Sequence, residues 1–272
     1  MLFISAGCGR TKAVQLKGSD TMVNLGEAWT EKFMEENPSI AIAVTGGGSG
    51  TGIAALINRT TDIAMTSREM QEKEIKLANQ NGVYPREIKV ANDGIALVVS
   101  PQNPISKLTL KQLSDIFSGK ITNWKEVGGE DKRIVALSRD RNSGTHVFFL
   151  ENVVKLGNKK NKEEFAKEVL MMPSSQAIVE EVAGNSEAVG YIGLGYLNKR
   201  LKSIAVAKDS ASPFILPGDE SVTNGSYPIA RGLYLYTDRN PGIDATNFID
   251  FALSKEGQQI VKQMDFVPLK NL

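Results

Sequence analysis

The stretch Ile134-Val-Ala-Leu-Ser-Arg-Asp-Arg-Asn-Ser-Gly-Thr-His-Val-Phe-Phe-Leu150 carries the clearest signal for the fold. Its first four apolar residues predict a strand, its polar centre a loop, and its second apolar run the start of a helix. A helix N-terminus presents unpaired backbone N–H groups and a partial positive charge, which favour a bound anion. The Ser143 and Thr145 hydroxyls would add hydrogen-bond donors. The stretch therefore predicts an anion site in which Arg139 or Arg141 supplies the countercharge.

Two earlier parts of the chain have the same strand, loop and helix pattern. In the first, a strand at 14–17 leads through Gly18-Ser-Asp-Thr21 into a helix that ends at Asn37-Pro38. In the second, a strand at 40–44 leads through Gly46-Gly-Gly-Ser-Gly-Thr-Gly52 into another helix. Glycines let backbone amides approach a ligand closely. Three such junctions predict one small anion held from several sides, because no single loop can surround a tetrahedral oxyanion.

A fourth polar segment follows the short apolar strand expected at 61–66. Ser67 and Arg68 then stand at the C-terminal end of a strand, where ligands of open α/β sheets gather. This position makes the pair further candidates for anion contacts. Arg68 could equally be a solvated residue at the start of the charged surface helix expected at 69–81.

Strands and helices continue to alternate along the rest of the chain. We expect a strand at 88–100, a short helix at 110–117, a Lys/Glu-rich amphipathic helix at 155–170, strands at 188–193 and 229–237, and helices near the C-terminus. This alternation predicts an α/β fold with largely parallel sheets. A chain of 272 residues suits two domains of about 100 to 150 residues each. Because no linker separates them, we expect the chain to cross between domains near residues 93 and 229, with a ligand site between the domains.

The composition narrows the class of protein. A hydrophobic fraction of 41% with 23% charged residues is typical of a soluble globular protein. The net charge of +1 provides no basic field, so nucleic-acid binding is excluded and any anion must be bound by local geometry. No run of about 18 apolar residues occurs, which argues against a membrane span.

The first nine residues, Met1-Leu-Phe-Ile-Ser-Ala-Gly-Cys-Gly9, resemble the end of a bacterial lipoprotein signal. In such signals small residues precede a cysteine that becomes the acylated N-terminus, which makes Cys8 a candidate lipid anchor. Ser5 departs from the leucine of that pattern, and a charged leading region is missing. The alternative is a stray thiol near a chain end. Cys8 is the only cysteine, so an internal disulfide is excluded.

Five motifs, spread over nearly the whole chain after residue 12, carry a family resemblance. They are Gly18-Ser-Asp-Thr-Met22, Gly46-Gly-Gly-Ser-Gly-Thr-Gly52, Ile116-Phe-Ser-Gly-Lys-Ile-Thr-Asn-Trp124, Arg139 with Ser143-Gly-Thr145, and Tyr227-Pro-Ile-Ala-Arg-Gly-Leu-Tyr-Leu-Tyr-Thr237. In this order they resemble the phosphate-binding proteins of bacterial and archaeal ABC uptake systems. Any one glycine-rich loop would be a weak signal, whereas the ordered set is specific.

The resemblance implies a type II periplasmic binding protein fold, in which two α/β domains joined by two crossing segments close on the anion. With the expected crossings, domain I spans 12–93 and 228–272, domain II spans 94–227, and 1–11 is a signal or anchor remnant. The implied phosphate ligands are Thr21, Met22, Ser49, Ser67, Arg139, Ser143, Gly144 and Thr145, with Ser19, Arg68 and Asp93 as further candidates.

The same resemblance implies a function. We expect a monomer outside the cytoplasm, in the periplasm or on the outer face of the membrane and anchored there through Cys8. It would capture inorganic phosphate, without catalysis, cofactor or metal, and deliver it to the permease subunits of an ABC transporter and their ATPase.

One position departs from many members of the family. Where they have Ser-Asp, with a carboxylate that accepts a phosphate proton, this chain has Ser67-Arg68. Phosphate near neutral pH still carries a proton and sulfate does not, so a carboxylate in the site favours phosphate and repels sulfate. We expect Asp93 to replace the missing acceptor, with Arg68 as its partner or as a ligand contact. The rivals are Asp20 and Asp140, and each of the three could instead be a helix cap or a hinge hydrogen bond.

Other functions fit less well. The segment Gly50-Thr-Gly-Ile-Ala-Ala55 fits a dinucleotide pattern only in a loop too long for it, and no nucleotide-hydrolysing P-loop motif occurs. A single histidine, His146, makes acyl transfer or metal binding a poor expectation. Three alternatives stay open, namely a binding protein for sulfate or molybdate, a phosphatase on the same fold, and a phosphate sensor or scavenger without a transporter.

Overall fold

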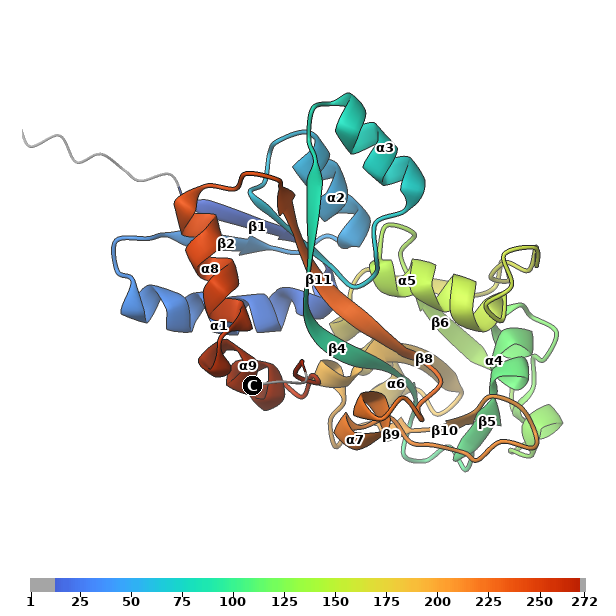
Figure 1. The fold of residues 1–272 in the computed structure, drawn as a ribbon. Helices are drawn as coiled ribbons and strands as arrows, with labels where there is room; N and C mark the ends of the chain where they lie inside the picture. Colours follow the sequence, from blue (N-terminus) through green and yellow to red (C-terminus); the bar gives the residue numbers. More distant parts are fainter. Residues whose placement is uncertain (1–12, 270–272) are drawn as a thin grey trace, which may run out of the picture.

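The computed structural model describes residues 13–269, so Cys8 and the expected anchor segment lie outside the described residues. Within that range one mixed sheet has the strand order β2-β1-β3-β11-β4-β8-β6-β7, with β9 beside β4, and β5 pairs separately with β10. Helices lie on both sides of this sheet (Figure 1). The expected α/β class is confirmed. The sheet is mixed rather than largely parallel, because the central strands β4 and β11 run antiparallel to their neighbours.

The first half of the chain forms a parallel α/β unit, as the repeated pattern predicts. Its elements are β1 (Val14–Gly18), a 3₁₀ turn (Asp20–Met22), α1 (Val23–Glu36), β2 (Ile42–Thr45), α2 (Ser49–Ile57), β3 (Ile63–Thr66) and α3 (Glu72–Gln80). β1 pairs in parallel with both β2 and β3, so the C-terminal ends of the three strands lie at the same edge of the sheet. The polar loops that follow β1, β2 and β3 are thereby brought together.

The middle of the chain builds a second α/β unit. Its elements are β5 (Lys107–Thr109), α4 (Leu110–Phe117), a 3₁₀ turn (Trp124–Val127), β6 (Val135–Arg139), α5 (Gly144–Phe149), β7 (Leu170–Met172), α6 (Ser175–Gly184), β8 (Ala188–Gly193), a 3₁₀ turn (Leu194–Tyr196), β9 (Lys202–Ser203), β10 (Ala205–Ala207) and α7 (Asp219–Thr223). α5 continues as a π-helix over Leu150–Val154. Here β6 is parallel to β7 and β8.

Two long strands connect the two units. β4 (Pro85–Val99) pairs with β11 (Ala230–Asp238) along its first part and with β8 along 95–99. The two strands run side by side through the centre of Figure 1, and after β11 the chain returns to the first unit with α8 (Ile243–Leu253) and α9 (Lys255–Gln263). The crossings expected near residues 93 and 229 therefore coincide with the pairing of Asp93 with Arg231.

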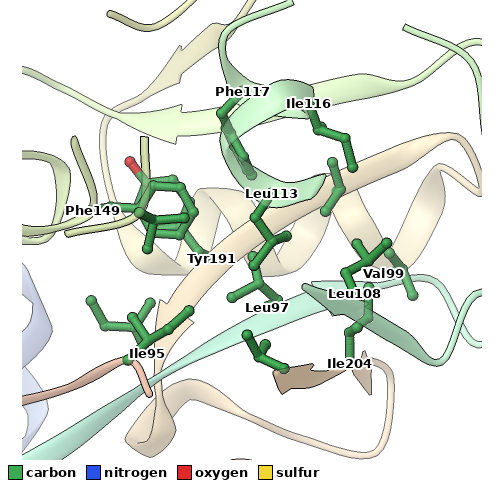
Figure 2. Close-up of a cluster of buried hydrophobic side chains, with 14 of the residues drawn as sticks. Ile95, Leu97, Val99, Leu108, Leu113, Ile116, Phe117, Phe149, Tyr191 and Ile204 are labelled. Atoms are coloured by element: carbon green, nitrogen blue, oxygen red, sulfur yellow. The ribbon is translucent and has the colours of Figure 1, made fainter. Parts of the chain in front are cut away.

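The apolar core changes along these crossing strands. Ile95, Leu97 and Val99 of β4 pack with α4, α5 and β8 in a cluster that includes Phe117, Phe149 and Tyr191 (Figure 2). The Phe149 and Tyr191 rings are stacked with their centroids 3.8 Å apart. Earlier residues of β4, up to Ala91, pack instead with α1, α8 and α9. The domain boundaries remain a prediction, which this change of core supports.

The helix expected at 155–170 is wrong. Residues 155–169 form turns and irregular backbone, and the next element is β7. Leu156 has a left-handed backbone with φ of 53°, which ends the helix before it. Asn158 and Asn161 then accept hydrogen bonds from backbone N–H groups two residues ahead, at 3.0 Å each, and such side-chain turns compete with helix formation. The segment is rich in Lys and Glu and has few apolar side chains that a helix could bury.

Candidate anion site

Four hydroxyl side chains from four different elements meet at one edge of the sheet. Thr21 follows β1, Ser49 begins α2, and Ser67 follows β3. Thr145 lies in the first turn of α5, in the other unit, and its Oγ1 lies 2.9 Å from Oγ1 of Thr21. The Ser49 hydroxyl accepts a hydrogen bond from the backbone N–H of Ser67 at 3.1 Å. All four residues are buried. Four of the predicted ligand residues are thus brought into one place.

The start of α5 fits against two of these hydroxyls only because residue 144 is glycine. A Cβ atom on Gly144 would lie 2.3 Å from Oγ of Ser49 and 2.6 Å from Oγ of Ser67. The preceding Ser143 caps the helix by accepting the backbone N–H of His146. The predicted residues Gly144 and Thr145 therefore lie against the first unit, and Ser143 precedes them as the cap of α5.

The glycine-rich loop contacts the loop that precedes α5. The Asn142 side chain donates to the carbonyl of Gly47 at 2.8 Å, and the Asn142 carbonyl accepts the N–H of Gly50 at 2.9 Å. Gly48 has a left-handed φ of 91°, and a Cβ there would come 2.8 Å from the Asn142 carbonyl oxygen. Glycine is therefore required for the backbone shape and for this close approach between the two units.

Arg139 is buried and pairs with Asp20, the residue before Thr21, whereas Arg141 is exposed. Strand β6 extends to Arg139, so this residue belongs to a strand and not to the expected loop. Its Nη2 donates to Oδ2 of Asp20 at 2.7 Å, and its other bonds are to Ser175 and to the carbonyls of Met172 and Pro173. A guanidinium has five N–H groups, so one on Nη1 remains to bind a ligand. The other oxygen of Asp20 accepts the N–H of Gly47.

A second buried arginine, Arg231, was not among the expected site residues. Its Nε and Nη2 donate to Oδ2 of Asp93 at 3.1 and 2.9 Å. Its Nη1 donates to Thr145 Oγ1 at 3.0 Å, and its Nη2 donates to Thr21 Oγ1 at 3.3 Å. The other oxygen of Asp93 accepts the N–H of Leu194. Burial raises the pKa of the Asp93 carboxyl group and the positive charge of Arg231 opposes that effect.

The expected partnership of Asp93 with Arg68 is wrong. Arg68 forms a two-pronged ion pair with Glu74, at 2.8 and 2.7 Å, on the first turn of α3. Glu74 also accepts the N–H of Gln71 and so caps the helix. A local carboxylate six residues away competes better for Arg68 than one on a crossing strand. Asp93 takes Arg231 instead, because the two residues pair directly across β4 and β11.

Two further expected ligands have local partners. The N–H of Met22 donates to the carbonyl of Ser19 within the 3₁₀ turn, and the N–H of Ser19 donates to the carbonyl of Met65. Both residues are buried next to Thr21. Asp140, the third acidic candidate, is half-buried in the loop after β6.

The ring of the single histidine, His146, contacts Ser138, whereas the Ser143 hydroxyl bonds to the His146 backbone N–H. Nδ1 of the ring lies 3.0 Å from the hydroxyl of Ser138, which is also 2.6 Å from the hydroxyl of Tyr191. Burial lowers the pKa of His146. Among residues 13–269, no group of three or more His, Cys, Asp and Glu side chains could hold a metal ion. Within the same range no helix is long and apolar enough to cross a membrane.

Comparisons with known proteins agree with this geometry. A family model described as a PBP superfamily domain matches residues 6–256. The chain is 31% identical to the phosphate-binding protein PstS of Pseudomonas aeruginosa, over 93% of this chain and 81% of the relative. It is also 31% identical to PstS of Bacillus subtilis, over 96% of this chain and 82% of that relative.

Solved structures of phosphate-binding proteins are also similar to this chain. A substrate-binding protein from Clostridium perfringens, assigned to phosphate ABC transport and holding phosphate, matches with a TM-score of 0.85 and 34% identity, over 95% of this chain and all of the other. An ABC-type phosphate transport receptor from Vibrio cholerae matches with a TM-score of 0.75 and 30% identity, over 94% of this chain and all of the other. The expected type II periplasmic binding protein fold is confirmed.

Arg231 did carry a signal that could have been used. It is the only charged residue in the apolar stretch Ile229–Tyr236, which was expected to be part of a crossing strand. A charge in such a strand must be paired, because an unpaired buried charge is very costly. The pairing register with Asp93, which the sequence does not give, was needed to identify its partner.

Proposed function

The chain belongs to the PstS family of phosphate-binding proteins, and from this premise we propose that it captures inorganic phosphate outside the cytoplasm and delivers it to the permease of an ABC transporter. The family binds its ligand without chemical change, so the proposal includes no reaction and no cofactor. The anion would be recognised by hydroxyl and backbone donors together with one guanidinium.

One observation carries the proposal more than any other. Thr21 and Thr145, from opposite units, lie with their hydroxyl oxygens 2.9 Å apart, and buried Arg231 donates to both. Buried Arg139 pairs with Asp20, the residue before Thr21. Hydroxyls and guanidinium groups at this point can surround a tetrahedral oxyanion with donors from both sides. The proposed phosphate-binding residues are Thr21, Ser49, Ser67, Arg139, Ser143, Gly144 and Thr145.

Calorimetric titration tests the proposal directly. The protein is first unfolded and refolded to release any carried-over anion, and is then titrated with phosphate, sulfate and molybdate. We expect one phosphate per chain and much weaker binding of the other two. Tighter binding of sulfate or molybdate would assign the site to that anion, and binding of none would refute the proposal. Turnover of a chromogenic phosphomonoester would instead indicate a phosphatase.

Two finer features belong to the same proposal. The protein would be held at the outer face of the membrane through an acylated Cys8, and it would act as a monomer. Membrane fractionation of the wild type and of Cys8→Ser tests the anchor, because only the wild type should sediment with membranes. Light scattering with and without phosphate tests the monomer, and co-purification with a permease separates a transport protein from a free scavenger.

A further inference from the structure

Arg231 occupies a central position between the two units. Its strand, β11, is one of the two crossing strands, and its guanidinium reaches the Ser67 carbonyl and Thr21 in the first unit and Thr145 in the second. The side chain is 1% exposed, and its ion-pair partner Asp93 is 0% exposed. The Arg231 guanidinium therefore contacts a proposed phosphate-binding hydroxyl in each unit, Thr21 in the first and Thr145 in the second.

The hydrogen bonds of Arg231 use its whole donor capacity. Two N–H groups go to Asp93, one to the Ser67 carbonyl, one to Thr145 and one to Thr21. A guanidinium has five N–H groups, so none remains for a ligand in this arrangement. Arg231 therefore differs from Arg139, which keeps one N–H on Nη1 outside its protein bonds. The difference argues that Arg231 acts on the anion through the hydroxyls.

The effect on the hydroxyls follows from their donor and acceptor count. A threonine hydroxyl has one O–H to donate and two lone pairs that accept. Arg231 occupies a lone pair on Thr21 and another on Thr145, and the 2.9 Å contact between them uses one of the two O–H groups. The second O–H is left to donate to a ligand oxygen. A cation bonded to a hydroxyl oxygen also makes its proton a stronger donor.

We infer that Arg231 is a positioning residue of the anion site, which fixes the Thr21 and Thr145 hydroxyls as donors and is itself held in place by Asp93. The inference rests on the proposed function. It gives Asp93, whose two oxygens accept hydrogen bonds from Arg231 and from Leu194, the role of a partner that holds Arg231 in place. It predicts that Asp93 acts on affinity and leaves the phosphate-to-sulfate ratio unchanged.

A double-mutant cycle on phosphate affinity tests this role. Arg231→Gln should weaken phosphate binding by about tenfold or more, and Arg231→Lys should recover only part of the loss because an ammonium lacks the planar fork. In the wild type, Thr145→Val removes a donor that is oriented by Arg231. In the Arg231→Gln background the same change should cost at least about threefold less, because the hydroxyl is no longer oriented there.

Ser49→Ala provides a matched comparison within the site. The Ser49 hydroxyl does not contact Arg231 and shares only Ser67 with it, so its coupling with Arg231→Gln should be weaker than that of Thr145. Gln258→Met controls for stability alone, because Gln258 is a buried hydrogen-bond centre that holds β4 by the Val90 carbonyl, away from the site. It should lower the unfolding midpoint and leave phosphate affinity unchanged.

If Arg231→Gln alone does not fold, the neutral pair Asp93→Asn with Arg231→Gln replaces it as the background. Equal coupling of Ser49 and Thr145 with Arg231, or phosphate binding that is unchanged in the Arg231 variants, would overturn the positioning role. A changed phosphate-to-sulfate ratio in Asp93→Asn would make Asp93 the proton acceptor expected from the sequence and would also overturn it. The wild-type titration decides the proposed function separately. If another tetrahedral anion binds instead, the same cycle is measured with that anion, and if none binds, both proposals fall.

Discussion

The site contains two arginine–aspartate pairs, Arg139 with Asp20 and Arg231 with Asp93, and they are built differently. Arg139 and Asp20 come from separate units, 119 residues apart, and the Asp20 side chain is 18% exposed. Arg231 and Asp93 face each other directly on the adjacent strands β11 and β4, and neither is more than 1% exposed. The first pair joins elements that belong to different units, whereas the second lies within the connecting strands.

This difference assigns different tasks to the two arginines. Arg139 can exchange Asp20 for an anion, because the Asp20 carboxylate is 18% exposed to water and keeps the backbone N–H of Gly47 as a donor. Arg231 cannot leave Asp93 in this way, because Asp93 is fully buried and an unpaired charge at that position would cost much stability. We therefore expect the Arg139 pair to respond to ligand and the Arg231 pair to maintain the site's shape.

The largest expected effect is on stability, from breaking the Arg231 pair. Asp93→Asn or Arg231→Met leaves one buried charge without its partner, which costs about 3 to 5 kcal/mol of unfolding free energy. The double variant removes both charges and should recover much of that loss. Urea unfolding of the two single variants and the double variant measures this. Additive losses in the double variant would show that the two residues do not act as a pair.

The next effect is on affinity, from removing Arg139. Arg139→Ala should weaken phosphate binding about 30-fold or more, since a charge-assisted contact of about 2 to 5 kcal/mol is lost. Calorimetry at constant ionic strength measures the change. Arg141→Ala is the matched control, because Arg141 lies two residues further along the chain, is exposed and should have little effect. Unchanged affinity in Arg139→Ala would remove Arg139 from the binding residues.

The contrast between the two pairs also shows what the sequence could predict. The loops that follow β1, β2, β3 and β6 were predicted because glycine, serine and threonine between apolar runs mark local backbone geometry, and these loops brought Thr21, Ser49, Ser67 and Thr145 together. Arg139 was expected for the same local reason.

The partners of the charged residues could not be predicted in this way. Whether Asp93 pairs with Arg68 or Arg231 depends on the register between β4 and β11, and the Arg68–Glu74 pair depends on where α3 begins. The failed helix at 155–170 has a similar cause. Its charge pattern fits a helix, but the turns made by Asn158 and Asn161 and the left-handed Leu156 decide the backbone locally.

A smaller effect on selectivity should come from Asp20. Its carboxylate lies 2.7 Å from Arg139, next to the proposed anion, and it should repel sulfate more than phosphate, which can donate a proton to it. Asp20→Asn should therefore reduce the phosphate-to-sulfate affinity ratio by about tenfold, roughly 1.4 kcal/mol. Competition titrations of Asp20→Asn and Asp93→Asn compare the two carboxylates. A ratio that falls in Asp93→Asn but not in Asp20→Asn would reverse the assignment made here.

The smallest expected effect is a pH dependence of the unfolding free energy that comes from His146, near Arg139 in the chain. His146 supports the strand that carries Arg139, through Ser138 and Tyr191, and burial lowers its pKa from the ordinary value of 6.5. The folded state therefore resists protonation, so the stability that depends on neutral His146 is present above about pH 6.5 and is lost as the pH falls through the lower folded-state pKa. His146→Gln keeps a hydrogen-bonding side chain that does not titrate, and its unfolding free energy should change less than that of the wild type between pH 7.5 and 5.5. Because His146 is the only histidine, equal slopes in the two proteins would place the acid sensitivity on carboxyl groups instead.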